Sequence, residues 1–211
     1  MTIEKNILAG ETCEWVLIDS PSLDWHIRQQ ANSFVRLVIA NFHSAAHQIH
    51  IDHLGTQCST EVYVLAYLHG EDAVTLQTHM HHNVGDGKSV QLVKLVLDDS
   101  SKGTFVGELQ ILPDAQHVVA QQTNRNLLLS TQSEVRTQPQ LEIYADDVQA
   151  SHGASTGQLD ETALFYMRQR GISPEQGRKM LLRAFVDDIV EKVSDSNLRQ
   201  QLECSIDSIL Q

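Results

Sequence analysis

Short strand-like segments follow one another from residue 34 to residue 149, and no helical pattern separates them. Segments such as FVRLVIANF, EVYVLAYL and SVQLVKLVL are rich in β-branched and aliphatic residues, which favour strands. In EVYVLAYL, Val62 and Val64 alternate with Tyr63 and Leu65, as on the two faces of one strand. Because helices of about 10–15 residues do not intervene, the pattern argues against β-α-β units. It predicts a mainly β chain built as a sandwich, a barrel or a solenoid.

The joints between these segments contain single glycines with polar neighbours, at Gly55, Gly70 and Gly103. Asp86-Gly87 is the only Asp-Gly or Asn-Gly pair between strands, although such pairs are the strongest short signal for tight hairpins. Corners of this kind suit a solenoid, but the sequence repeat is irregular. The residues alone therefore leave the three β architectures open.

Different patterns mark the two ends of the chain. ILAGETCEWVLID predicts a strand, a turn and a strand, and the segment from Pro21 to Gln30 predicts a loop or a short helical turn. The last part of the chain predicts three helices, over residues 161–170, 174–192 and from about 197 onward. Asp160 and Ser173 are suitable N-caps for the first two, and Gly171 suits the end of the first. We therefore expect a β domain over residues 1–157 and a small helical domain over residues 158–211.

Composition narrows the functional classes. The formal net charge of -12, with no basic stripe, disfavours binding to nucleic acid. No run of about eighteen apolar residues is present, so no membrane span is expected, and MTIEKNILAG does not resemble a secretory signal. The three cysteines are far apart and form no C-x-x-C pair. This predicts a reducing, cytoplasmic setting and argues against a disulfide framework or a zinc site made of cysteines alone.

The eleven histidines raise the question of metal binding. His79 and His81 would share one face of a strand, about 7 Å apart by the rise of a strand. Two imidazoles at that spacing could hold a metal ion if a third ligand came from another strand. The alternative, and the more common case, is that they are ordinary polar residues on a strand and loop. Four further histidines have nearly helical spacing, but the residues around them favour a strand: His43, His47, His50 and His53.

His152 lies in a Ser-His-Gly-Ala-Ser run after a strand-like segment and before the first predicted helix. Small neighbours leave its imidazole accessible, so it could bind iron or exchange a proton near neutral pH, although the residues alone favour a structural role. The carboxylates of Glu142, Asp146 and Asp147 could form an acid–base pair, but adjacent residues of a strand point to opposite faces. No nucleophile elbow, phosphate-binding loop or dinucleotide fingerprint is present.

The residues from Tyr144 to Ile172, YADDVQASHGASTGQLDETALFYMRQRGI, resemble the C-terminal signature of the SufB/SufD family, in its SufD-like branch. GTFVGELQILPDAQHVVAQQTNRNLLLS and TQPQLEIY, further upstream, resemble the same family. The resemblance implies a right-handed parallel β-helix followed by a helical domain, and so selects the solenoid among the three architectures.

The resemblance also implies a function. Family members are non-enzymatic scaffold subunits that assemble iron–sulfur clusters with a SufB-like paralogue and a SufC-like ABC ATPase. His152 matches a family histidine that is implicated in cluster assembly between subunits. The cluster would be transient and shared with the partner, and no cofactor is expected for this chain alone. The subunit interface would include Glu142, Tyr144, Asp146 and Asp147. The helical region would dock the ATPase, through apolar and basic residues such as Phe165, Tyr166, Arg168, Arg170 and Phe185; core packing is the alternative role for the aromatic ones.

Three departures from the family pattern stand out. The chain is about half the usual family length, and the part without a counterpart is N-terminal. Ala150 stands where SufD-like proteins often carry cysteine, and Ser133 stands near the position of the SufB scaffold cysteine. We therefore expect the partner to supply the sulfur-accepting thiolate. Two other functions stay open: a β-helix carbohydrate-active enzyme acting through Glu142, Asp146 and Asp147, which the few aromatic residues disfavour, and a purely structural homodimer.

Overall fold

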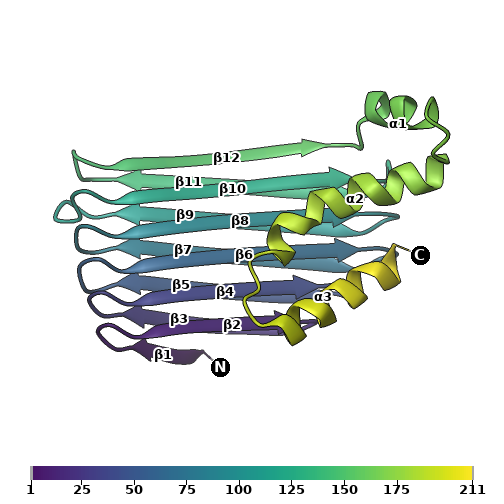
Figure 1. Cartoon of the computed structure of the whole chain (residues 1–211). Coiled ribbons are helices and arrows are strands. Elements are labelled where there is room, and N and C mark those ends of the chain that lie inside the picture. Colours follow the sequence, from purple (N-terminus) through teal and green to yellow (C-terminus); the bar gives the residue numbers. More distant parts are fainter. Residues whose placement is uncertain (1, 211) are drawn as a thin grey trace.

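The computed structural model describes residues 2–210 and consists of two parallel six-stranded sheets followed by three helices (Figure 1). The odd-numbered sheet contains, in spatial order, β1 (Ile3–Ile7), β3 (Ser22–Gln29), β5 (Ala45–His53), β7 (Ala73–His82), β9 (Lys102–Ile111) and β11 (Glu134–Ile143). The even-numbered sheet contains β12 (Gln149–Gly157), β10 (Val119–Leu128), β8 (Lys88–Leu97), β6 (Ser59–Leu68), β4 (Phe34–Asn41) and β2 (Thr12–Ile18). Successive strands alternate between the sheets, so the chain winds as a parallel β-solenoid, as the family resemblance implied.

The main core fills the space between the two sheets. Leu76 and Met80 of β7 and Val93 and Leu95 of β8 are fully buried there, and buried and partly exposed positions alternate along both strands up to these residues. Strand periodicity of two places every second side chain in this core. At the corners, residues such as Asn32 adopt positive φ and turn the chain without a hairpin.

Three helices complete the chain: α1 (Glu161–Arg168), α2 (Pro174–Val190) and α3 (Ser196–Ile209). The predicted caps are confirmed, because Asp160 accepts bonds from the first turn of α1 and Ser173 forms a capping box with Gln176. The first helix ends at Arg168, slightly earlier than predicted, and Gly171 follows with φ +83°. None of the helices within residues 2–210 is both long and apolar enough to cross a lipid bilayer.

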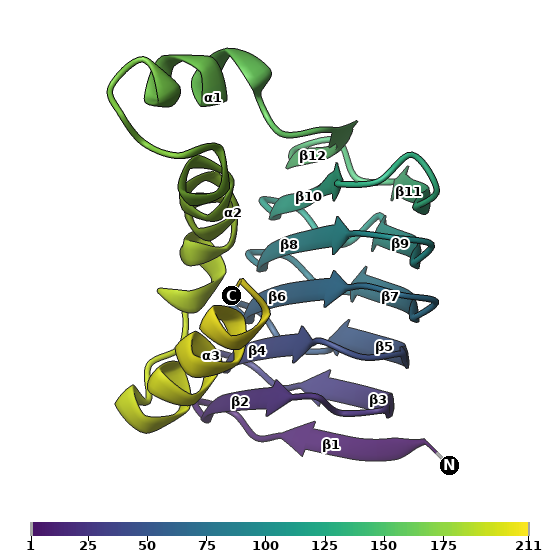
Figure 2. The ribbon, with the colours of Figure 1, turned by 90° about the vertical axis from the view of Figure 1, so that its right-hand side faces the viewer.

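Helices α2 and α3 lie along the outer face of the even-numbered sheet (Figure 2). Val38 and Leu65 of that sheet form a second core with Leu182 and Ile189 of α2 and Leu202 of α3. This explains why both faces of the EVYVLAYL strand are apolar, since one packs against the odd-numbered sheet and the other against helices. The outer face of the odd-numbered sheet lies on the side away from the helices (Figure 2).

The prediction of a loop or helical turn from Pro21 to Gln30 is wrong, because most of that segment is strand β3. Leu23, Trp25 and Ile27 alternate inward and are buried, whereas Asp24 and His26 point outward. The charged outward residues hid the period of two, which is the only local signal of a strand here.

Candidate functional site

The last strand of each sheet, β11 and β12, pairs on one side only and leaves the C-terminal end of the solenoid open (Figure 1). The described residues of β12 are nearly all exposed, although β12 is fully paired with β10 on its other side. An open strand edge of this kind offers unpaired backbone donors and acceptors to another chain. The end of the solenoid is therefore a surface suited to a partner.

His152 lies inside β12, and not in a connection between a strand and a helix as the sequence suggested. Its run of small polar residues shows no apolar alternation, so the pairing with β10 alone defines the strand. His152 is opposite Gln122, which is buried on the inward face of β10, and in parallel strands such partners share a face. The imidazole is exposed because no further turn of the described solenoid covers it.

Below His152, the inward face carries a column of amides. Gln91 of β8 pairs with Gln122, and Gln122 pairs with His152. The Gln91 Oε1 accepts a hydrogen bond from the Thr78 hydroxyl at 2.8 Å, but neither side-chain polar atom of the buried Gln122 has a partner among the described residues. Buried amides without partners are rare in proteins. The column thus ends at His152, and the Gln122 amide beside it has a donor and an acceptor that are not used.

The carboxylates proposed with His152 lie on different elements around the same end. Glu142 is on the outer face of β11, where it accepts a bond from Gln110 Nε2 at 2.9 Å. Asp146 and Asp147 lie in the connection from β11 to β12, beyond the strand that the sequence analysis extended through them. An Asp147 oxygen is 3.3 Å from His117 Nε2, and Tyr144, at the start of that connection, is exposed. The structure gathers these residues at one end but does not place the carboxylates on one strand face.

Helix α1 buries none of its residues, so its aromatic side chains face solvent. Phe165 and Tyr166 are 62% and 57% exposed. Arg168 is also exposed, and the Arg170 guanidinium lies 3.7 Å from the centre of the Tyr166 ring. Phe185 differs from these four, because it packs on the second core of α2 with the Lys94 ammonium 4.6 Å from its ring. For Phe185, then, the structure shows core packing.

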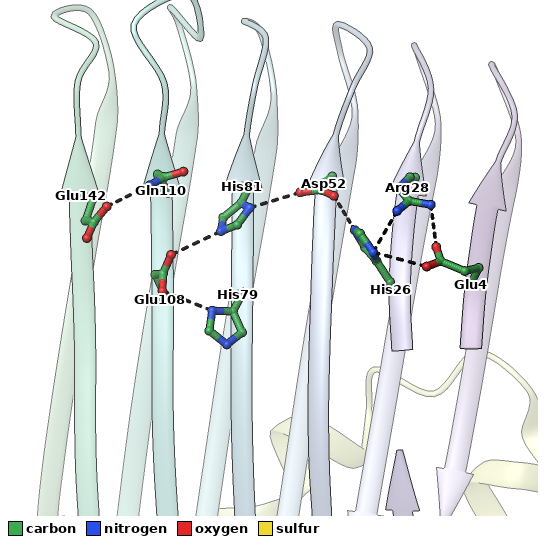
Figure 3. Close-up of polar contacts among 9 residues, drawn as sticks. All are labelled: Glu4, His26, Arg28, Asp52, His79, His81, Glu108, Gln110 and Glu142. Atoms are coloured by element: carbon green, nitrogen blue, oxygen red, sulfur yellow. Dashed lines mark hydrogen bonds and ion pairs between the residues drawn. The ribbon is translucent and has the colours of Figure 1, made fainter. Parts of the chain in front are cut away.

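A group of imidazoles and carboxylates lies on the outer face of the odd-numbered sheet, mid-way along the solenoid (Figure 3). Glu108 of β9 is within 3.2 Å of His79 Nδ1 and 3.3 Å of His81 Nε2. The other ring nitrogen of His81 is 3.2 Å from Asp52 of β5. Asp52 in turn contacts His26 Nε2 at 2.5 Å. The sequence paired His79 with His81 on one face, as observed, but missed Asp52 and Glu108 because strand register cannot be read from one segment.

The charges in this group stabilise one another. The hydrogen bond to His81 is the main cause that lowers the pKa of Asp52 to about 2. The same bond raises the pKa of His81. Burial opposes a lower pKa for Glu108, but its bonds to His81 and His79 outweigh burial and lower that pKa. The contacts therefore favour ionised carboxylates at Asp52 and Glu108 and a protonated imidazole at His81.

Comparison with known proteins gives one consistent family. The model of the SUF system FeS cluster assembly SufBD core domain matches residues 23–185. SufD of Escherichia coli is 40% identical over 126 residues, which are 60% of this chain and 30% of SufD. A SufBD family protein of Synechocystis is 32% identical over 178 residues, 83% of this chain and 39% of that protein. The chloroplastic protein ABCI7 of Arabidopsis thaliana is 30% identical over 211 residues, 99% of this chain and 42% of ABCI7. The chain therefore spans less than half the length of these relatives.

Proposed function

This chain belongs to the SufB/SufD family of the SUF system for iron–sulfur cluster assembly and is SufD-like, and from this premise we propose that it is a non-enzymatic scaffold subunit. It would pair with a SufB-like paralogue and bind a SufC-like ABC ATPase. The observation that carries the proposal is the position of His152 on the inward face of β12, at the open end of the solenoid. There a second subunit could cover the imidazole and enclose a nascent cluster between the two chains.

The open end supports such an interface in two ways. The unpaired edges of β11 and β12 could pair with strands at a homologous end, which would give their free backbone donors and acceptors hydrogen-bond partners. Tyr144 supplies an exposed aromatic ring beside these edges, and aromatic residues are common at the centre of interfaces. Glu142, Asp146 and Asp147 would form the polar rim around it.

The partner would supply the thiolates for the cluster. None of the three cysteines, Cys13, Cys58 and Cys204, lies in β11 or β12. Ser133, in the corner before β11, has a hydroxyl that donates to the Ser130 carbonyl at 2.9 Å and offers no sulfur. A neutral imidazole is a good iron ligand, so His152 could contribute one nitrogen to a cluster that is otherwise held by the partner. The cluster is the cargo of the assembly, transient and shared.

The test is to replace His152 in the complex formed with its SufB-like and SufC-like partners. His152→Ala should lower the yield of iron–sulfur cluster several-fold while the complex still forms, because the change removes one exposed ligand and no buried contact. Ser155→Ala, on the outward face of the same strand, is the matched control and should retain the yield. A yield unchanged in His152→Ala would refute the role of this imidazole, and recovery of only a homodimer would refute the heteromeric scaffold.

Binding of the ATPase is proposed at α1 and the adjoining edge of α2. Phe165 and Tyr166 are more than half exposed within the described chain, and exposed aromatic pairs of this kind indicate an interaction surface. Met180, 51% exposed, lines a groove between α2 and α3 that extends the apolar surface. Arg168 and Arg170 place positive charge at the margin of α1.

A double variant tests this docking surface. Phe165→Ala with Tyr166→Ala should weaken binding of the ATPase by at least about 10-fold, as expected for aromatic residues at the centre of an interface. Gln169→Ala, at the exposed C-cap of the same helix, should bind as the unaltered protein does. Unchanged affinity of the double variant, measured by calorimetry with the purified ATPase, would exclude α1 as the docking element.

A further inference from the structure

His79, His81 and Glu108 each offer one ligand atom, and these atoms lie within 4.8 Å of one another on the outer face of the odd-numbered sheet. We propose that they form a binding site for a divalent transition-metal ion, independent of the proposed cluster site at His152. In-register pairing creates the group: His79 of β7 is directly opposite Glu108 of β9, and His81 is two residues further along the same face. The third ligand therefore comes from the neighbouring turn of the solenoid.

The contacts from Glu108 to each imidazole have the length expected between two ligand atoms of one ion. Zinc bonds to nitrogen and oxygen of about 2.0–2.1 Å in a tetrahedral site place two ligand atoms about 3.3 Å apart. Glu108 Oε2 lies 3.2 Å from His79 Nδ1, and Glu108 Oε1 lies 3.3 Å from His81 Nε2. Hydrogen bonds between charged groups are shorter, about 2.7–2.9 Å. The neighbouring Arg28–Glu4 pair does reach 2.6 Å, so short contacts form on this face where geometry allows.

Asp52 is placed to orient one of the ligands. Its carboxylate is 3.2 Å from His81 Nδ1, so a proton on Nδ1 would be donated to Asp52 and Nε2 would be left free for the metal ion. A carboxylate behind a ligating histidine is the usual outer partner in metal sites, where it fixes the tautomer and ring orientation. On the other side, the His79 ring stacks on His50 at 4.3 Å with the planes 3° apart, which restrains its rotation.

The donor set indicates the class of metal. Two imidazoles and one carboxylate bind Zn²⁺ and Fe²⁺, whereas Mg²⁺ and Ca²⁺ prefer oxygen ligands alone. The three side chains are 24%, 28% and 24% exposed, so the site is half-buried and open to solvent on one side. Water or a small ligand could occupy the remaining positions of the ion. The bound ion would link β7 to β9 and would replace the hydrogen bonds between Glu108 and the two imidazoles.

Metal titration of the purified, chelator-treated chain tests the proposal. We expect one Co²⁺ per chain with the visible absorption of a four- or five-coordinate ion, and competition by Zn²⁺ and, under anaerobic conditions, by Fe²⁺. Glu108→Gln keeps the shape of the side chain but removes the anionic ligand, and should weaken binding at least 10-fold. Asp52→Asn leaves the ligands in place and should weaken binding by about 10–100-fold, the range for outer partners of metal-binding histidines.

Two controls separate this site from other histidines. His43→Ala removes an exposed imidazole outside the group, and His152→Ala removes the proposed cluster ligand; both should bind Co²⁺ as the unaltered chain does. The absence of binding to the unaltered chain would overturn the proposal. It would also be overturned if Glu108→Gln and His81→Ala both bound Co²⁺ as tightly as the unaltered chain does. Loss of binding in His152→Ala alone would also overturn it, because the ion would then be at the end of the solenoid. None of these outcomes depends on cluster assembly, so the two proposals can fail separately.

Discussion

The outer faces of the two sheets carry opposite chemistry, although the same chain winds through both in parallel register. On the even-numbered sheet, Val38, Leu65 and Val96 are fully buried beneath α2 and α3. On the odd-numbered sheet, the corresponding outward positions carry imidazoles and carboxylates such as His79 and Glu108, which are partly exposed. Because the core between the sheets already stabilises a solenoid, each outer face is free to specialise. The outer face of the even-numbered sheet packs against helices, and that of the odd-numbered sheet is polar.

Truncation on the two outer faces should show the difference most strongly. Leu65→Ala, beneath the helices, should lower the free energy of unfolding by about 2–5 kcal/mol, because it removes fully buried methyl groups and leaves a cavity. Gln77→Ala, on the outer face of β7, should change it by less than about 0.5 kcal/mol. Urea unfolding followed by circular dichroism measures both. Similar effects of the two substitutions would mean that α2 and α3 do not cover the even-numbered sheet in solution.

Adjacent histidines of β7 should respond to pH in opposite directions. His82 points inward and is fully buried, and burial lowers its pKa to about 4. The unfolded chain then binds more protons than the folded one, so stability should fall as the pH drops from about 6.5 to 4, by about 3 kcal/mol for this group. His81 points outward and has a raised pKa, so it stabilises the fold below its unfolded pKa and loses that contribution as the pH rises through its folded pKa.

Variants at these two positions separate the contributions. His82→Gln should flatten the loss of stability between pH 6.5 and 4, measured by urea unfolding at each pH, and His81→Gln should not. Part of the loss of stability at low pH should persist in His82→Gln, because burial also lowers the pKa of His47 to about 4. If the two variants showed the same pH profile, the inward and outward assignment of β7 would be wrong.

Two histidines on the outward face of β7, His79 and His81, show how far the sequence could predict the molecule. A period of two placed His79 and His81 on one face, and N-cap residues located the helices, because both signals are local. The partners of His81 could not be predicted, since Asp52 and Glu108 are brought to it by strand register, and register depends on corner lengths in the whole solenoid. The strand containing His152 lacks apolar alternation, and only its pairing with β10 defines it. The choice of a solenoid came from family resemblance and not from the strand pattern.

An ion pair between a buried lysine and a partly exposed aspartate attaches the helices to the even-numbered sheet. Lys94 extends outward from β8, its side chain is 3% exposed, and its ammonium is 2.6 Å from Asp188 of α2. The ammonium also donates to the Phe185 carbonyl. Burial lowers the pKa of Lys94, and the hydrogen bond and charge of Asp188 oppose that shift. Asp188→Asn should therefore cost about 1–3 kcal/mol of unfolding free energy, because it leaves a buried ammonium without its anion. An unchanged urea midpoint would contradict this dependence.

The odd-numbered sheet offers an ion pair of the same length whose cation is exposed, whereas the ammonium of Lys94 is buried, and it should give the smallest effect. Arg28 and Glu4 are also 2.6 Å apart, but their side chains are 37% and 48% exposed. Water already solvates both charges, so Glu4→Gln should change the free energy of unfolding by about 0–1 kcal/mol, and that change should vanish in high salt. The effect of Asp188→Asn should persist in high salt, since its ammonium is out of contact with solvent. Urea unfolding of both variants at low and high ionic strength decides the matter. Because the two contacts are equally long, a larger loss in Glu4→Gln would show that burial by the helices is not what distinguishes the two faces.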